Sequence, residues 1–150
     1  YDRIEFKIAP NRGEEMRPLR ETASGGEISR IMLAIKSVFA ETDQISALIF
    51  DEIDTGIGGE VANAVGEHLA QLGAHKQILC ITHLASIAVR ADNHLKVVKY
   101  EHQGRTLTKV ESVRDTKRVE EIARMLSGDR NDETSRHHAM ELLERYHPEE

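Results

Sequence analysis

The sequence of 150 residues lacks several features that each point to a particular class of protein. It has a single cysteine, Cys80, which excludes an internal disulfide framework and a metal site built from several cysteines. No apolar run approaches the roughly 18 residues that a membrane-spanning helix needs, so we expect no transmembrane segment. Hydrophobic residues still make up 39% of the chain, which is enough for a folded core and one domain.

The sequence also has little of what a nucleic-acid-binding surface needs. The 20 Lys and Arg residues are outnumbered by 26 Asp and Glu residues, so the formal net charge is -6. A strongly basic face is the usual footprint of a protein that binds DNA or RNA. Aromatic residues are 4% of the chain and tryptophan is absent, which argues against a base-stacking platform. We therefore expect that any main DNA-binding surface lies elsewhere.

The spacing of apolar residues predicts an α/β domain with a mainly parallel sheet, flanking helices and a β-hairpin. Short apolar runs of strand length suit a parallel sheet whose strands are buried on both faces. These buried strands are expected at 47–50 and 78–81, the hairpin at 95–100 and 106–113, and a half-buried strand at 4–8. Apolar residues at three- and four-residue steps predict helices. These helices are expected at 28–39, 61–72, 119–126 and 139–146, with a short one after residue 83.

The first candidate site is a pair of adjacent acids, Asp51 and Glu52, at the end of the first buried strand. The carboxyl ends of parallel strands line the crevice in which α/β folds bind ligands. Two neighbouring carboxylates repel each other, and a Mg²⁺ ion, which prefers oxygen ligands, would offset that repulsion. Asp51 would then hold the Mg²⁺ shell and Glu52 would point at an attacking water. The alternative is that the strand simply ends there and the acids begin a solvated loop.

The second candidate is the run Ser24-Gly25-Gly26-Glu27, which opens the first long helix. Glycines let a ligand approach the backbone closely, and the free N–H groups of a first helical turn form an anion site. The Ser24 hydroxyl could add a hydrogen bond to a phosphate oxygen. The alternative is a capping box between Ser24 and Glu27. Because each glycine costs about 1 kcal/mol relative to alanine in a helix, we favour phosphate binding.

The third candidate is His83, which follows Thr82 at the end of the second buried strand. A histidine there can donate to a phosphate or orient a water, although a lone histidine at a strand end is more often structural. The primary phosphate-binding loop, G-x-x-x-x-G-K-S/T, does not occur in the sequence. The chain begins at Tyr1 rather than Met. We therefore expect it to be a piece of a longer protein that carries this loop elsewhere.

In their order and spacing these motifs resemble four successive elements of ABC-type ATPases. The run 24–27 resembles the signature motif, Asp51-Glu52 the Walker B acids, 53–56 the D-loop, and His83 the switch histidine. Glu27, where transporters commonly have glutamine, resembles the SMC-related branch that handles DNA. The runs 23–30, 50–57 and 80–84, together with the helical tail, resemble most closely the C-terminal part of the RecN family of bacterial DNA-repair proteins.

The resemblance implies that residues 1–150 form the C-terminal lobe of an ABC/SMC-type P-loop ATPase head. An N-terminal Walker A lobe of the same protein, separated from it by a long coiled coil, would complete the head. The implied cofactors are ATP and Mg²⁺. Asp51 would be the metal ligand, and Glu52 and His83 would be catalytic, with His83 sensing the γ-phosphate. In a homodimer, the loop of Ser24, Gly25, Gly26 and Glu27 would bind the nucleotide of the opposing head, and Asp54 would contact that head.

By the same resemblance, ATP would join two heads and hydrolysis would release them. The full protein would be cytoplasmic and nucleoid-associated in a bacterium, and would hold broken DNA during double-strand-break repair and recombination. The chain alone is expected to be inactive, because nothing in it can cradle the β-phosphate. Two alternatives remain: the nucleotide-binding subunit of an ABC transporter, and a non-catalytic dimerisation module. Heptads upstream would indicate the RecN-like protein, and a compact Walker A and Q-loop lobe a transporter.

Overall fold

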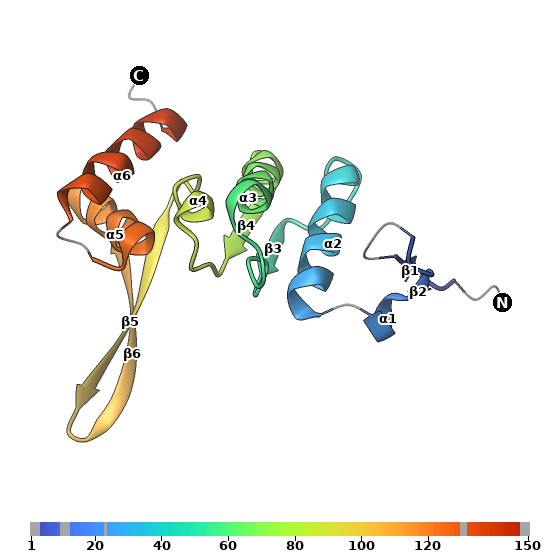
Figure 1. Ribbon diagram of the computed structural model, residues 1–150, viewed down its shortest axis with the longest axis horizontal. Coiled ribbons are helices and arrows are strands. Elements are labelled where there is room, and N and C mark those ends of the chain that lie inside the picture. The colour runs from blue at the N-terminus through green and yellow to red at the C-terminus, as the bar shows by residue number, and fades with distance from the viewer. Residues whose placement is uncertain (1–3, 10–12, 23, 130–131, 148–150) are drawn as a thin grey trace.

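The chain runs from a small N-terminal hairpin, through helices and short strands, to a C-terminal pair of helices (Figure 1). The computed structural model describes residues 4–9, 13–22, 24–129 and 132–147. The elements in chain order are β1 Lys7–Ile8, β2 Arg17–Pro18, α1 Leu19–Thr22, α2 Gly25–Val38, β3 Ala47–Phe50, α3 Gly59–Gly73, β4 Gln77–Cys80, α4 Ala85–Ala88, β5 His94–His102, β6 Arg105–Val113, α5 Asp115–Ser127 and α6 Glu133–Tyr146. In the described ranges, no helix combines the length and the apolarity that crossing a membrane requires.

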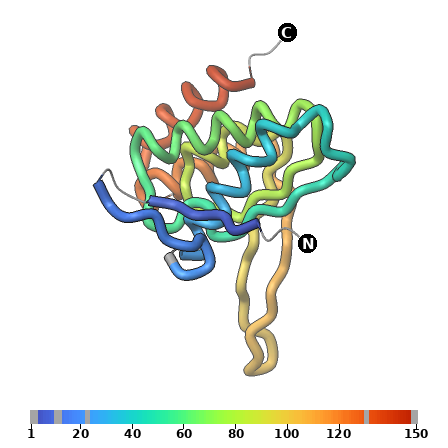
Figure 2. The backbone as a smooth tube through the Cα atoms, turned by 90° about the vertical axis from the view of Figure 1, so that its right-hand side faces the viewer, coloured from blue at the N-terminus to red at the C-terminus, as the bar shows by residue number. Residues whose placement is uncertain are grey.

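The described strands pair as three separate two-stranded sheets. β3 and β4 are parallel and in the register that sets Leu48 beside Ile78, with α3 as the crossover. β1 and β2 are antiparallel, and the strand predicted at 4–8 is limited to Lys7–Ile8. β5 and β6 form a long antiparallel hairpin that projects away from the other elements (Figures 1 and 2). The α/β composition, the parallel pair and the hairpin are as predicted.

A first group of buried residues, here called the strand cluster, packs against one face of the β3–β4 pair. Its members, from α2, β3, α3, α4 and the turn after β3, are Leu33, Phe50, Ile53, Val65, Leu69, Leu72 and Ile87. The opposite face carries Ile49 and Leu79, which are 72% and 46% exposed, and Ile81 just beyond β4 is 59% exposed. The prediction that both strands are buried on both faces is therefore wrong for this chain, because no described element covers the second face.

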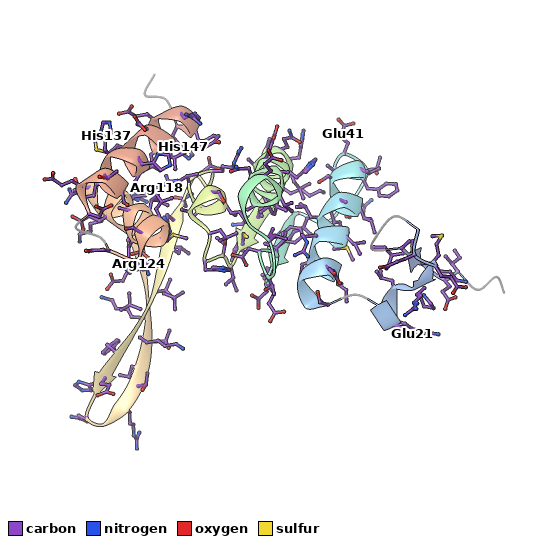
Figure 3. The ribbon with its side chains drawn as sticks, viewed as in Figure 1. Glu21, Glu41, Arg118, Arg124, His137 and His147 are labelled. Atoms are coloured by element: carbon purple, nitrogen blue, oxygen red, sulfur yellow. The ribbon has the colours of Figure 1, made fainter. Side chains whose placement is uncertain are left out.

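A second group, the helix cluster, joins α4, α5 and α6. Its members are Ala85, Ala88, Val89, Ile122, Ala123 and Ala139. Arg118 of α5 and His147, at the end of α6, lie side by side with Nη2 and Nε2 3.3 Å apart (Figure 3). Glu121 of α5 is 5% exposed and forms ion pairs with Lys96 of β5 and Arg124. These contacts hold the two helices together and fasten the base of the hairpin to them.

Candidate functional site

Helix α2 begins at a capping box. The Ser24 N–H donates to Glu27 Oε2 at 2.8 Å, and the Glu27 N–H donates to Ser24 Oγ at 3.4 Å. The pair satisfies N–H groups that the start of a helix leaves without intrahelical partners. The capping-box alternative is therefore confirmed. It does not exclude phosphate binding, because the Ser24 hydroxyl accepts in the cap and keeps its own O–H as a donor.

The two glycines of this loop lie against the turn that follows β3, and at Gly26 the backbone of that turn leaves no room for a side chain. A Cβ atom at Gly26 would lie 2.8 Å from the carbonyl oxygen of Glu52 and 3.1 Å from Cβ of Thr55. A Cβ atom at Gly25 would lie 2.5 Å from Glu52 Oε2. The first turn of α2 thus lies directly on the turn that follows β3. Close packing is a reason for the glycines that the sequence reasoning missed, because only the fold brings residues 26 and 52 together.

The turn after β3 presents the two acids at the carboxyl end of the strand, as predicted. Asp51 and Glu52 are both exposed. The Glu52 N–H donates to Asp51 Oδ1 at 2.9 Å, and the Thr55 N–H donates to the Glu52 carbonyl at 3.0 Å. Glu52 has φ +56, in the left-handed region that residues other than glycine seldom adopt. The backbone therefore reverses sharply at the residue that carries the proposed catalytic carboxylate.

Two side chains of α2 hold this turn in place. Ser29 Oγ donates to the Asp51 carbonyl at 2.8 Å. Arg30 Nη1 donates to the carbonyls of Ile53 and Thr55 at 3.1 Å and 3.0 Å. Neither residue was among the predicted site residues. The signal that could have found them is spacing, since each lies four positions after one of the two glycines and so shares its helix face.

Asp54 is buried and faces residues at the end of β4. Its side chain is 5% exposed, and Oδ2 accepts the Thr82 hydroxyl at 2.6 Å and the His83 N–H at 2.7 Å. His83 Nδ1 lies 2.9 Å from the same oxygen. Burial raises the pKa of Asp54, but the hydrogen bonds from Thr82 and His83 outweigh it, so the pKa lies below its usual value. Asp54 is therefore an ionised acceptor at neutral pH.

This contact orients the His83 ring. With Nδ1 facing Asp54, Nε2 is the ring nitrogen left for a ligand, and the side chain is 73% exposed. An acidic partner that fixes the tautomer and direction of a histidine is a common arrangement at functional sites. The resemblance led us to expect Asp54 at a contact with a second head. The structure instead places its carboxylate within the chain, on His83, and the head contact stays a prediction.

The side chains at the site suit a metal ion that takes few ligands from the protein. They do not provide a reactive thiol. Within the ranges that the structure describes, no group of three or more His, Cys, Asp or Glu side chains could hold a metal. Mg²⁺ usually takes only one or two protein carboxylates and completes its shell with waters and phosphates, so Asp51 fits it. Burial and the nearby charges of Asp54 and Asp51 raise the pKa of Cys80 to about 12. Cys80 is thus a weakly reactive thiol.

The three predicted motifs, which are far apart in the sequence, meet around the turn 51–55. The first turn of α2 contacts it at Glu52, and the end of β4 contacts it at Asp54. The start of α2, a pair of exposed acids and a histidine oriented by Asp54 therefore lie around one turn. This is the arrangement in which one set of residues can bind phosphate while another prepares a water molecule for attack.

Curated relatives match almost the whole chain. Proteins described as DNA repair protein RecN match from Treponema pallidum, with 54% identity over 143 residues, and from Bacillus subtilis, with 44% over 142 residues. Each alignment covers 95% of this chain and 25% of the relative. The relative from Haemophilus influenzae is 38% identical over 146 residues, covering 97% of this chain and 26% of that protein. The chain belongs to the RecN family. It spans about a quarter of the length of these relatives, in their C-terminal part.

No protein-family model matches the chain. Among solved structures, a chain described under the structural biochemistry of ATP-driven dimerization and DNA stimulated activation of SMC ATPases is 22% identical, with a TM-score of 0.49. The superposition covers 70% of this chain and 62% of that one. This likeness is too weak to assign a family, and the chain's membership of the RecN family follows from its sequence relatives alone.

Proposed function

We propose that the chain is the C-terminal lobe of an ABC/SMC-type ATPase head in a RecN-family protein that acts in DNA double-strand-break repair and recombination. ATP bound between two such heads would hold them together, and its hydrolysis would release them. The observation that carries this proposal is the meeting of the Ser24 loop, the Asp51-Glu52 pair and His83 around one turn. The relatives, which are described as DNA repair proteins, favour this function over that of a transporter subunit.

The face of the β3–β4 pair opposite the strand cluster, here called the bare face, supports the proposal that the head has a second lobe. Ile49, Leu79 and Ile81 partly expose apolar side chains there, and complete burial of an apolar side chain of this size contributes at most about 1.5–3 kcal/mol. Three quarters of the relatives' length lies outside this chain. The N-terminal lobe of the same protein, which would carry the Walker A loop, is the occupant that fits. Residues 1–150 would then be one lobe of a composite domain.

The proposed roles within one head follow from the resemblance to ABC-type ATPases. Asp51 would hold Mg²⁺, which would neutralise charge on the phosphate oxygens. Glu52 would accept a hydrogen bond from the attacking water and align it in line with the γ-phosphate. His83 would contact a γ-phosphate oxygen through Nε2 as an imidazolium, the form in which both ring nitrogens donate, while Asp54 accepts from Nδ1. Asp54 therefore acts on the nucleotide through His83.

The proposed roles across two heads involve the start of α2. The Ser24 hydroxyl and the N–H groups of Gly25 and Gly26 would bind the γ-phosphate held by the opposing head, while Glu27, whose N–H donates to Ser24 Oγ, caps the helix. The resemblance of residues 53–56 to a D-loop still predicts a contact between heads at this turn. Thr55 and Gly56 are exposed, so they are better placed for that contact than the buried Asp54 carboxylate.

Replacement of Glu52 in the full-length protein tests the function. Glu52→Gln keeps the size of the side chain but removes the acceptor strength that aligns and activates the water. We expect ATP hydrolysis to fall by about 100-fold or more while ATP binding persists, so that a dimer accumulates in ATP. Light scattering of the nucleotide-bound protein and ADP release would measure this. Glu60→Gln, an exposed acid in the first turn of α3, is the matched control.

Two results would contradict the proposal. One is a Glu52→Gln protein that stays monomeric in ATP yet hydrolyses it at the normal rate. The other is steady turnover by the 150-residue chain alone, since this chain has no loop for the β-phosphate. A dimer that forms normally while neither Glu52→Gln nor the unmodified full-length protein hydrolyses ATP would favour the non-catalytic dimerisation module.

A further inference from the structure

Arg30 lies close to both the start of α2 and the turn after β3, the two segments that carry the Ser24 loop and Glu52. It lies one helical turn after Gly26, and a Cβ atom at Gly26 would be 3.0 Å from Arg30 Nη1. The same nitrogen donates to the carbonyls of Ile53 and Thr55 in the turn after β3. A guanidinium bonded to carbonyls makes charge-assisted hydrogen bonds, which are stronger than those between neutral groups. The start of α2 and the turn are thus bound together through one side chain.

The backbone on either side of Glu52 is held by α2. Ser29 holds the carbonyl of the residue before Glu52, and Arg30 holds the carbonyl of the residue after it. Glu52 itself has φ +56, a conformation that persists only where the surroundings impose it. Hydrogen bonds from the helix that carries the Ser24 loop therefore hold the backbone from which the Glu52 side chain projects.

We propose that Arg30, assisted by Ser29, is a positioning residue that fixes Glu52 relative to helix α2. This rests on the proposed role of Glu52 in ATP hydrolysis. Arg30 need not touch the nucleotide to act, because its Nη1 already donates to two backbone oxygens of the turn. Loss of Arg30 leaves the Glu52 carboxylate present but free to leave the productive direction, and a misplacement of about 1 Å can cost up to 100-fold in rate.

The first experiment compares Arg30→Met with Arg30→Lys in the full-length protein. Methionine keeps much of the length of the side chain and removes every donor, whereas lysine keeps a charged donor. We expect Arg30→Met to bind ATP within about twofold of the unmodified protein while kcat falls about tenfold or more, and Arg30→Lys to recover part of that loss. Lys36→Met is the control, since Lys36 lies on the same helix and pairs with Asp43, away from the turn.

The second experiment uses mixed dimers purified through two different tags, in which one head carries Glu52→Gln so that only one Glu52 works. In one dimer, Arg30→Met lies on the head with the intact Glu52. In the other, Arg30→Met lies on the head that already carries Glu52→Gln and supplies only its Ser24 loop. We expect the first dimer to lose about tenfold in kcat relative to a dimer without Arg30→Met, and the second to stay within about twofold.

The outcomes distinguish a failure of the positioning role of Arg30 from a failure of the proposed function. Equal losses in the two mixed dimers, or no loss in either, would overturn the positioning role of Arg30. If Glu52→Gln leaves hydrolysis unchanged in the same assay, the proposed function fails instead. If Arg30→Met does not fold, as judged by circular dichroism, the variant Ser29→Ala tests the positioning role instead. It removes only the bond to the Asp51 carbonyl, and we expect kcat to fall severalfold at unchanged KM; an unchanged kcat would refute the proposal.

Discussion

The strand cluster and the helix cluster differ in how completely the chain encloses them. Ile122, Ala123 and Ala139 of the helix cluster are fully buried between α4, α5 and α6. The strand cluster covers only one face of β3 and β4, and Ile49 on the other face is 72% exposed. The half of the chain that carries the candidate site is thus the half with an open apolar surface.

The same contrast holds for charged groups. In the helical half, Glu121 is buried and accepts from Arg124 Nε and Nη2 at 3.0 Å and 2.6 Å as well as from Lys96. At the candidate site, Asp51, Glu52 and the His83 ring are exposed. Charged groups that serve structure are paired inside the chain, whereas most of those proposed for chemistry are open to solvent.

The largest difference between the clusters should appear when a buried methyl-rich side chain is truncated. Ile122→Ala leaves a cavity in the fully enclosed helix cluster, so we expect the free energy of unfolding of the 150-residue chain to fall by about 2–5 kcal/mol. Ile81→Ala, on the bare face, should change it by no more than about 0.5 kcal/mol. Urea denaturation followed by circular dichroism measures both. Similar losses for the two variants would abolish the contrast.

A second prediction asks whether the bare face is covered in the full protein. Ile49→Ala should leave the stability of the 150-residue chain unchanged within about 0.5 kcal/mol, because the side chain is already in solvent. In the full-length protein it should cost about 2–4 kcal/mol, as in a core. Proteolysis or hydrogen exchange at β3 would report the change in each context. Equal sensitivity in both would show that nothing covers this face.

A third prediction concerns acid. Burial raises the pKa of Glu121, but the hydrogen bonds from Arg124 and Lys96 outweigh it and lower the pKa below its usual value. A carboxyl whose pKa is lower in the folded state adds stability above its unfolded pKa of about 4.3, and this is lost as the pH falls further. Glu121→Gln should therefore cost about 1–3 kcal/mol at pH 7 and flatten the acid limb of a plot of stability against pH. An acid limb identical to that of the unmodified chain would contradict it.

The smallest effect is expected at Cys80, on β4. With a pKa of about 12, this thiol is almost entirely protonated at pH 8. We expect alkylation by iodoacetamide to be roughly 100-fold or more slower in the folded chain than in urea, with no change in stability on Cys80→Ala beyond that of a small cavity. Labelling followed by mass spectrometry gives both rates. Fast labelling of the folded chain would mean that the strand cluster opens readily.

Local features of the sequence predicted the elements well. The three- and four-residue spacing of α2 and the Ser24–Glu27 cap depend on neighbours in the chain, and the structure has both. The segments that carry the resemblance, 24–27, 51–56 and 82–83, meet around one turn in the structure. Contacts between distant residues were missed, because nothing near Arg30 in the sequence indicates the carbonyl of Ile53, 23 positions away. The same is true of Asp54 and His83, 29 positions apart.

The bare face of β3 and β4 marks a different limit. A wholly apolar run such as 47–50 is typical of a strand that is covered on both faces. The sequence therefore indicated burial on both faces, whereas the chain by itself supplies a cover for only one. A hydrophobic pattern predicts that a surface is hidden and leaves open which part of a protein hides it.

The left-handed backbone at Glu52 has a consequence for how the protein can be improved. A residue with a Cβ atom gives up about 1–2 kcal/mol in this conformation, which glycine would recover. Libraries screened only for thermal resistance should therefore enrich glycine or asparagine at position 52, and the hardier proteins they return would have lost the carboxylate. Any programme of stabilisation in this family therefore needs a selection for the proposed ATP turnover alongside the one for heat.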